Sequence, residues 1–230
     1  MGLKVLAYTA LNPARRYPQA EARILGVEGV TRFVFDASAT PGEAWYQNIF
    51  RKYKSAREMC LRENFDALLT AESDMLIPRN AVQLLAENDA PVVYGLYVLR
   101  HGVPMWNAFV ALDEDAGFSL SDSIVRANAP AQYAGVMDRK PFDIYGAGFG
   151  CTLIRREALE KIEFRNLDTE NSFYVDWLFA ADANARGIRQ VMDPRVVCGH
   201  IAGNGMVLFP DTAHEHWCRA DYLTAQVMEV

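Results

Sequence analysis

The chain has 230 residues, of which 51% are hydrophobic, so it can bury a substantial core and is not expected to be disordered. Its formal net charge of -6 argues against a protein that coats nucleic acid electrostatically, which disfavours a nucleic-acid partner. Four widely spaced cysteines without a CxxC pair predict neither a zinc cluster nor a disulfide framework, and a reducing cytoplasmic location fits them best. We see no signal peptide and no apolar run long enough to span a membrane, so we expect a soluble protein.

The first hundred residues alternate short β-like runs with helix-like segments, the pattern of a mainly parallel sheet covered by helices. The predicted strands are residues 3–8, 31–35, 66–71 and 91–99. The predicted helices are residues 14–25, 43–63 and 79–87. In the longest helix apolar residues recur every three or four positions and basic residues fall between them, so it should cover the sheet and show solvent a basic face.

The second half is less periodic at first. Residues 101–145 mix Gly, Pro, Asp and Ser with aromatic residues and indicate irregular strands and loops more than repeated βαβ units. The glycine-rich residues 146–150 then precede the predicted strand 151–154, the helices 157–162 and 175–186, and the strands 190–192 and 196–198. No repeat or composition break marks a linker, so one domain is predicted.

Two acids, Glu72 and Asp74, stand one residue apart at the end of the predicted strand 66–71. In open α/β sheets ligands gather beyond the carboxyl ends of the strands, where a Glu-x-Asp pair can hold Mg²⁺ or Mn²⁺ against the phosphates of a donor. The alternative is a solvated turn in which Ser73 or Asp74 caps the following helix. On this segment alone neither interpretation is favoured.

A second series of motifs favours the metal site. DALLTAESDMLIP (66–78) is followed by GAGFGCTLIRREALEKI (146–162) and YVDWLFAADANARGIRQVMDPRVVCGHI (174–201). The series resembles GT-A glycosyltransferases, with a strand ending in a DxD-like motif, a glycine-rich turn before a strand and two arginines, an acid opening a helix, and a late histidine. Each motif is permissive, and the resemblance rests on their order and spacing over roughly residues 60–201.

The resemblance implies a single GT-A-like domain, in which a mixed, mainly parallel sheet is flanked by helices. Residues 1–100 would form the nucleotide-sugar-binding half and residues 101–201 the acceptor and catalytic half. Residues 202–230 are predicted as a C-terminal lid and tail, because the segment after His200 contains two glycines together with Met206 and Phe209; His214 and His216 in this segment are left unassigned. Closure of the lid would exclude water from the donor.

The resemblance also implies a metal site. Asp74 matches the metal-binding acid of the family motif, and Glu72 stands where an aspartate is commoner. His200 follows the predicted strand 196–198, where several such families supply a further metal ligand, and a neutral imidazole suits Mn²⁺ beside carboxylates. The alternative for His200 is a histidine at a strand end bonded to the backbone.

Asp176 opens the predicted helix 175–186, at the position where inverting members place the acid that deprotonates the acceptor hydroxyl. Because a helix N-terminus stabilises a charged carboxylate, we expect a lowered pKa and a weaker base than a buried acid would be. The alternative is a helix cap, and a retaining mechanism would not need this base.

The donor is assigned to the loops after the first two strands, residues 9–12 and 36–38, with Thr9 and Asp36 as contacts to the base and ribose. Turn chemistry in Asp-Ala-Ser is the alternative for Asp36. Arg57 could reach phosphate from the long helix, although a charged helical face is usually just solvated.

The glycine-rich turn is assigned to the sugar. Gly146 and Gly148 could let the backbone approach the ring closely, since glycine has no Cβ.

The sequence therefore predicts a metal-dependent, inverting glycosyltransferase that uses Mn²⁺ or Mg²⁺ and a nucleotide-diphosphate sugar. Candidate acceptors are a glycan, a lipid-linked glycan, a protein hydroxyl and a hydroxylated DNA base, the last disfavoured by the acidic charge. One alternative is a sugar-phosphate nucleotidyltransferase, but LAYTALNPARRYP lacks the glycine of a triphosphate-gripping loop. Another is a non-catalytic GT-A-like binding protein.

Overall fold

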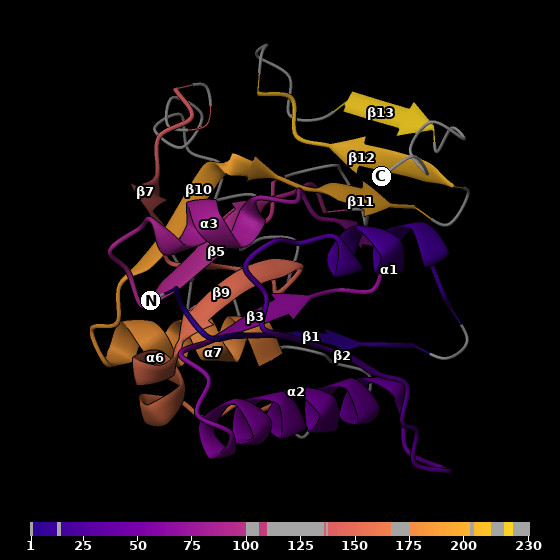
Figure 1. The fold of residues 1–230 in the computed structure, drawn as a ribbon, viewed down its shortest axis with the longest axis vertical. Helices are drawn as coiled ribbons and strands as arrows, with labels where there is room; N and C mark the ends of the chain where they lie inside the picture. Colours follow the sequence, from indigo (N-terminus) through magenta and orange to yellow (C-terminus); the bar gives the residue numbers. More distant parts are fainter. Residues whose placement is uncertain are drawn as a thin grey trace, which may run out of the picture.

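A computed structural model describes residues 2–12, 15–99, 106–109, 136, 138–166, 175–202, 205–212 and 219–222. Its centre is a seven-stranded sheet of order β2-β1-β3-β9-β5-β10-β7 (Figure 1). The strands are β1 (Val5–Ala10), β2 (Arg32–Asp36), β3 (Ala67–Ala71), β5 (Val92–Leu96), β7 (Phe142–Asp143), β9 (Cys151–Arg155) and β10 (Gln190–Val197). β9 runs antiparallel to β3 and β5, and β7 antiparallel to β10, whereas the other pairs are parallel. Five of the seven strands thus share one direction, and the sheet is mixed and mainly parallel.

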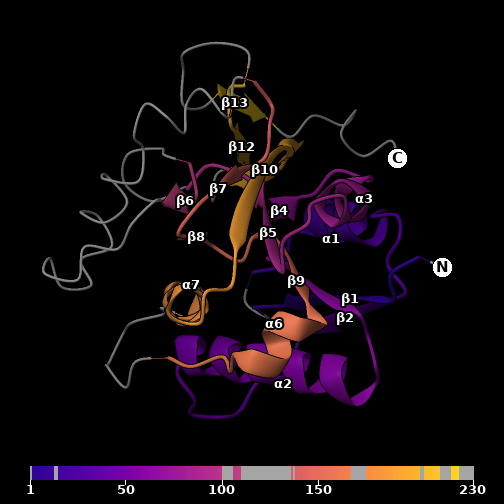
Figure 2. The ribbon, with the colours of Figure 1, turned by 90° about the vertical axis from the view of Figure 1, so that its left-hand side faces the viewer.

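Helices cover both faces of this sheet. They are α1 (Pro18–Leu25), α2 (Trp45–Arg62), α3 (Ala81–Ala86), α6 (Arg156–Lys161) and α7 (Val175–Ala185). α2, α6 and α7 lie on one face, and α1 and α3 on the other (Figure 2). Along β1, Leu6 and Tyr8 join the core under α2, while Val5 and Ala7 join the core under α3, as the alternation of a strand requires. The predicted fold class, a single α/β domain with a mixed, mainly parallel sheet flanked by helices, is confirmed.

A second sheet, of order β13-β12-β11-β4, is built from segments that the sequence did not predict as strands. Its strands are β4 (Met75–Leu76), β11 (Gly199–Ile201), β12 (Met206–Phe209) and β13 (Arg219–Tyr222). β11 pairs antiparallel with both β4 and β12, so that His200 stands opposite Met75 and Leu208. The described part of the predicted lid, residues 202–230, therefore contains paired strands; its closure stays a prediction, and His214 and His216 lie outside the described residues.

Two element boundaries differ from the prediction because of proline. α1 begins at Pro18, which occupies the start of the helix, where its missing N–H is not needed. β10 runs unbroken through Pro194, where two shorter strands were predicted, and its register against β5 shifts between Asp193 and Val197. Such an irregularity accommodates a proline inside a sheet.

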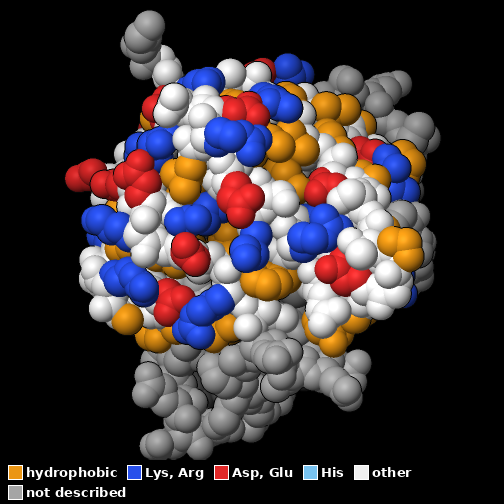
Figure 3. Space-filling view, turned by 90° about the horizontal axis from the view of Figure 1, so that it is seen from below, with side chains coloured by type: hydrophobic (Ala, Val, Ile, Leu, Met, Phe, Trp, Pro, Cys, Tyr) orange, Lys and Arg blue, Asp and Glu red, His pale blue; other side chains and the backbone are white. Residues whose placement is uncertain are grey.

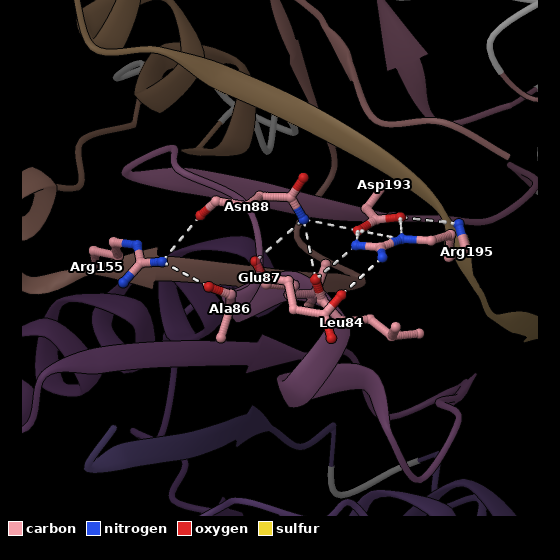
Figure 4. Close-up of polar contacts among 8 residues, drawn as sticks. Leu84, Ala86, Glu87, Asn88, Arg155, Asp193 and Arg195 are labelled. Carbon is pink, nitrogen blue, oxygen red and sulfur yellow. Dashed lines mark hydrogen bonds and ion pairs between the residues drawn. The ribbon is translucent and has the colours of Figure 1, made fainter. Parts of the chain in front are cut away.

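A buried carboxylate holds this part of β10 against the end of α3 (Figure 4). Asp193 is fully buried and accepts hydrogen bonds from Asn88 Nδ2 and Arg195 Nη2, both at 2.7 Å. Arg195 also pairs with Glu87 at 2.8 Å. Two guanidinium groups donate to the carbonyls that end α3: Arg195 to Leu84, and Arg155 to Ala86, Asn88 and Ala90. β10 is thereby fixed before the chain continues into β11.

The outer face of α2 is less basic than predicted. Figure 3 views the molecule from the α2 side and shows Lys and Arg side chains interspersed with Asp and Glu. A neighbouring segment supplies an acid in the ion pair between Arg51 of α2 and Glu43, and the pair Arg156–Glu160 lies within α6. Lys52 is not on this face, because it is buried and donates to Leu11 O at 2.6 Å. Across the described ranges, no helix combines the length and the apolar composition needed to cross a membrane.

Candidate active site

Glu72, Asp74 and His200 come together where β3 ends. One potential ligand atom from each lies within 4.8 Å of the other two. Glu72 and Asp74 belong to the turn from β3 to β4, which is closed by a bond from Met75 N to Glu72 O at 3.1 Å. β11 pairs with β4 and so brings His200 to the two acids from the other end of the sequence.

The hydrogen bonding of His200 leaves one ring nitrogen facing a carboxylate. Nδ1 lies 2.7 Å from Val98 O, and because a carbonyl only accepts, Nδ1 must carry the hydrogen. In the neutral ring Nε2 then presents a lone pair toward Asp74 Oδ2, 3.7 Å away, which is too long for a hydrogen bond. Nε2 is buried and has no hydrogen-bond partner among the described residues. Two acceptors that face each other in this way suit a cation between them.

The capping alternative for the acidic motif does not hold. α3 begins at Ala81 and its N-cap is Asn80, so neither Ser73 nor Asp74 caps this helix. Asp74 is only 6% exposed, and its backbone is tied to β11 by a bond from Ile201 N to Asp74 O at 2.9 Å. A cation bound here would lower the cost of burying a carboxyl group beside a second acid and an imidazole.

Asp176 lies in the first turn of α7. Its carboxyl group borders the glycine-rich turn, which in turn contacts Tyr97 beside the metal group. A Cβ built on Gly148 would lie 3.3 Å from Asp176 Oδ2 and 2.1 Å from the Tyr97 hydroxyl. Tyr97 in turn packs edge-on against the His200 ring, with centroids 5.6 Å apart. The prospective base and the prospective metal group therefore lie on two sides of Tyr97.

Burial raises the pKa of Asp176 to about 7, and the bond from Trp177 N to Asp176 Oδ1 only partly opposes this. The predicted lowering of this pKa is wrong. Although the residue keeps some exposed surface, the loss of hydration outweighs the stabilising N–H groups of the helix N-terminus. A carboxyl group with a pKa near 7 suits general-base catalysis at neutral pH.

Thr9 and Asp36 lie at the carboxyl ends of the neighbouring strands β1 and β2. Thr9 is 1% exposed, and within the described chain its Oγ1 has no hydrogen-bond partner. Asp36 accepts from the Tyr8 hydroxyl and from Ser38 N, so the predicted turn chemistry is present. Burial raises the pKa of Asp36, but these hydrogen bonds outweigh it and lower the pKa below its ordinary value. Asp36 is therefore a carboxylate at neutral pH.

A small hollow of about 30 Å³ adjoins these strand ends. Its lining residues are Leu11, Asn12, Trp45, Asn48, Ile49 and Lys52. Trp45, at the start of α2, is 58% exposed and offers an indole face beside the hollow.

The structure accounts for the two predicted glycines by packing inside the protein. A Cβ on Gly146 would lie 2.3 Å from Ala180 Cβ, so the missing side chain lets α7 approach β8 (Gly146–Ala147). The space beside Gly148 is filled by the Tyr97 hydroxyl. Their predicted contact with a sugar stays a prediction.

Arg57 is placed away from this region. Its Nε donates to Leu159 O and Ile162 O at 2.8 and 2.9 Å, at the end of α6. α6 follows β9, which is antiparallel to β3, so Arg57 lies toward the amino end of β3, opposite the acids. The structure therefore does not bring Arg57 to the predicted phosphate site.

Sequence analysis did not identify Tyr97 or Asn107 as parts of the site. Nothing in the pattern of residues 91–99 separates Tyr97 from an ordinary core aromatic, and Asn107 stands in a region without periodicity. Only the fold shows that Tyr97 lies beside His200 and the glycine-rich turn, and that Asn107 accepts a hydrogen bond from the backbone of Tyr97.

Comparison with known proteins gives likeness in fold alone. No family model matches the chain, and no curated protein matches it. The chain is similar to the crystal structure of A197 from STIV, with a TM-score of 0.58 and 16% identity over 96% of this chain and 99% of that one. A weaker likeness, with a TM-score of 0.48 and 12% identity, covers 83% of this chain and 82% of a glycosyltransferase involved in the glycosylation of the major capsid of PBCV-1. Another, with a TM-score of 0.46 and 10% identity, covers 87% of this chain and 43% of GalNAc-T7 with UDP, GalNAc and Mn²⁺.

Proposed function

We propose that this protein is a metal-dependent glycosyltransferase that uses a nucleotide-diphosphate sugar. The observation that carries the proposal is the buried group of Glu72, Asp74 and His200, in which His200 Nε2 faces Asp74 without a hydrogen bond. A helix cap, a solvated turn or a merely backbone-bonded histidine leaves this arrangement unexplained.

Asp74, Glu72 and His200 would hold the ion, and their mixed oxygen and nitrogen donors favour Mn²⁺ over Mg²⁺. When bound, such an ion neutralises charge on the diphosphate of the donor. Val98 O keeps His200 in the tautomer whose Nε2 can ligate. Asp74 contributes the more buried carboxylate, and Glu72 the more exposed one.

Asp176 is assigned the role of base toward the acceptor hydroxyl, which gives an inverting mechanism. Its carboxyl group is half deprotonated near pH 7 and can hold the proton of an attacking hydroxyl at an oxygen that borders the Gly148 turn. Only the carboxylate form can take this proton, so activity should rise as pH rises.

Thr9 and Asp36 are assigned to the nucleoside of the donor. Thr9 Oγ1 is a buried hydroxyl with an unused hydrogen bond in the described chain, and the charged Asp36 carboxylate can accept from ribose hydroxyls. Together with the hollow beside Trp45, they support residues 1–100 as the donor-binding half, and residues 101–201 are proposed as the acceptor-binding half.

The proposal is tested by incubating the protein with a panel of nucleotide-diphosphate sugars, with Mn²⁺ or with chelator. We expect metal-dependent release of nucleotide diphosphate and free sugar from one donor, since water replaces a missing acceptor. Consumption of a nucleoside triphosphate with a sugar phosphate would instead indicate a nucleotidyltransferase. Mn²⁺ and donor binding without turnover, also in the presence of acceptor panels, would indicate a non-catalytic binding protein.

A further inference from the structure

Tyr97 directly follows β5 and is buried between the metal group and the glycine-rich turn, at 2% exposure. On one side its ring stands edge-on to the His200 ring, at an interplanar angle of 88°. On the other side its hydroxyl fills the space that the side chains of Gly148 and Gly150 would occupy, and it accepts a hydrogen bond from Gly150 N at 3.4 Å. One side chain thus contacts both halves of the candidate site.

A buried carboxamide fixes the backbone of Tyr97. Asn107 Oδ1 accepts from Tyr97 N at 2.9 Å, and Asn107 Nδ2 donates to Gly95 O at 3.1 Å. Asn107 N also donates to Tyr97 O at 3.0 Å. Because Asn107 is 4% exposed, these bonds compensate its buried polar atoms, and they leave Tyr97 little freedom.

Residues next to Tyr97 or bonded to it each make one hydrogen bond to a proposed metal ligand. Val98 O, on the next residue, accepts from His200 Nδ1 at 2.7 Å. Gly150 N donates to the Tyr97 hydroxyl, while Gly150 O accepts from Glu72 N at 3.1 Å. A displaced Tyr97 would therefore disturb the ring of His200 and the backbone of Glu72 together.

We propose that Tyr97 is a positioning residue that holds His200 and, through the Gly148–Gly150 turn, Glu72 in the arrangement that binds the metal. This inference rests on the proposed function, because it concerns the same metal group. Groups that orient metal ligands from outside the coordination shell typically contribute about 10- to 100-fold to metal affinity. We therefore expect Tyr97→Phe, which removes only the hydroxyl, to weaken Mn²⁺ binding about tenfold.

The matched control is Tyr94→Phe. Tyr94 is buried in β5, the strand that Tyr97 directly follows, and its hydroxyl donates to Gln190 Oε1 at 2.6 Å, but neither Tyr94 nor Gln190 contacts the metal group. The free Mn²⁺ signal in electron paramagnetic resonance measures metal affinity without requiring activity. Both variants lose one buried hydrogen bond and should melt at lower temperature, yet only Tyr97→Phe should lose Mn²⁺ affinity.

A second pair of variants tests the contact itself. The backbone of Gly148 is not left-handed, so Gly148→Ala is tolerated by the backbone, but its Cβ would lie 2.1 Å from the Tyr97 hydroxyl and 3.4 Å from the ring carbon that carries it. The clash should be relieved in the double variant Gly148→Ala with Tyr97→Phe. We expect Gly148→Ala to reduce Mn²⁺ affinity strongly in the wild-type background and little in the Tyr97→Phe background.

The outcomes separate the two claims. If wild-type protein binds no Mn²⁺, the proposed metal-dependent function is refuted and the positioning role is refuted with it. If wild-type protein binds Mn²⁺ but Tyr97→Phe binds it as tightly as Tyr94→Phe does, or Gly148→Ala has equal effects in both backgrounds, the positioning role alone is refuted.

Discussion

Replacing Asp176 by asparagine should stabilise the protein at alkaline pH while it removes the proposed base. Burial raises the pKa of this carboxyl group from 3.8 to about 7, a rise of about 3 units. Each unit corresponds to about 1.4 kcal/mol, which gives a penalty of up to about 4 kcal/mol for the charged form. Because Asp176 keeps some exposed surface, solvent screens part of this penalty. We expect the free energy of unfolding of Asp176→Asn to exceed that of wild type by about 1 to 4 kcal/mol at alkaline pH.

The sign follows from proton linkage. The folded protein holds the Asp176 proton more tightly than the unfolded chain does, so the free energy of unfolding falls as pH rises from 3.8 through about 7. Above that pH the folded protein carries the full cost of the buried, charged Asp176 carboxylate. The amide side chain of the variant carries no charge at any of these pH values, so Asp176→Asn should match wild type near pH 4 and exceed it at pH 8.

Asp176→Asn should lose catalytic activity although it gains stability at alkaline pH. Asparagine has nearly the same shape and can still accept from Trp177 N, so metal and donor affinity should be retained. Turnover should fall by about two to four powers of ten, and the wild-type rate should rise with pH around a midpoint near 7.

The assay is urea unfolding at pH 4 and pH 8 in metal-free buffer, together with turnover, donor affinity and the anomeric configuration of the product by NMR. Asp182→Asn is the control, because Asp182 lies in the same helix but pairs with Arg165 at 2.7 Å away from the site, and it should keep full turnover. Unchanged turnover in Asp176→Asn, or a product that retains the donor configuration, would remove the base role. Equal stability of variant and wild type at pH 8 would refute the burial argument.

Four further substitutions test the metal group and the frame around it. Asp74→Asn should abolish metal-dependent donor binding in calorimetry, whereas Glu72→Gln, at the more exposed position, should keep measurable Mn²⁺ affinity; the reverse order would exchange the two roles. Asp193→Ala leaves Arg195 without its buried partner and should lower the free energy of unfolding by about 3 to 5 kcal/mol in urea, and a loss below about 1 kcal/mol would show that the network is dispensable. Gly146→Ala drives a Cβ to 2.3 Å from α7 and should lower the melting temperature, which an unchanged melting curve would contradict.

The parts of the fold that could be predicted are those whose pattern is local. Periodicity located α2, and β-like runs located β1, β2, β3 and β5, because each buries side chains at a regular spacing. The small sheet could not be found this way. β4 has two residues and β11 three, too few to show alternation, and they are strands because of pairing that the local pattern does not show: β4 with β11, and β11 also with β12.

Some residues of the candidate site could likewise be predicted from the sequence, whereas the placement of others depends on the fold. Glu72, Asp74 and His200 could be proposed from motif order, and the structure brings them within 4.8 Å of one another. Arg57 was proposed from charge on a helical face, but the direction in which a helix runs along the sheet decides which end of the sheet its residues reach. α2 starts after β2, so its later residues run back toward α6 and away from the strand ends that carry the acids.

The misjudged pKa of Asp176 shows why position along a helix is a weaker guide than depth in the protein. The first turn of a helix offers a few N–H groups, and here Trp177 N donates at 2.9 Å, as the sequence led us to expect. These donors stabilise charge only by about 1 kcal/mol, whereas loss of hydration in a packed interior can exceed that several-fold. Trp177 itself stacks on Phe109 with centroids 4.3 Å apart, and Gly148, beside the Asp176 carboxyl group, has no side chain that could donate a hydrogen bond to it. The apolar residues beside Asp176, and not the helix that carries it, therefore give this acid a pKa suited to take a proton.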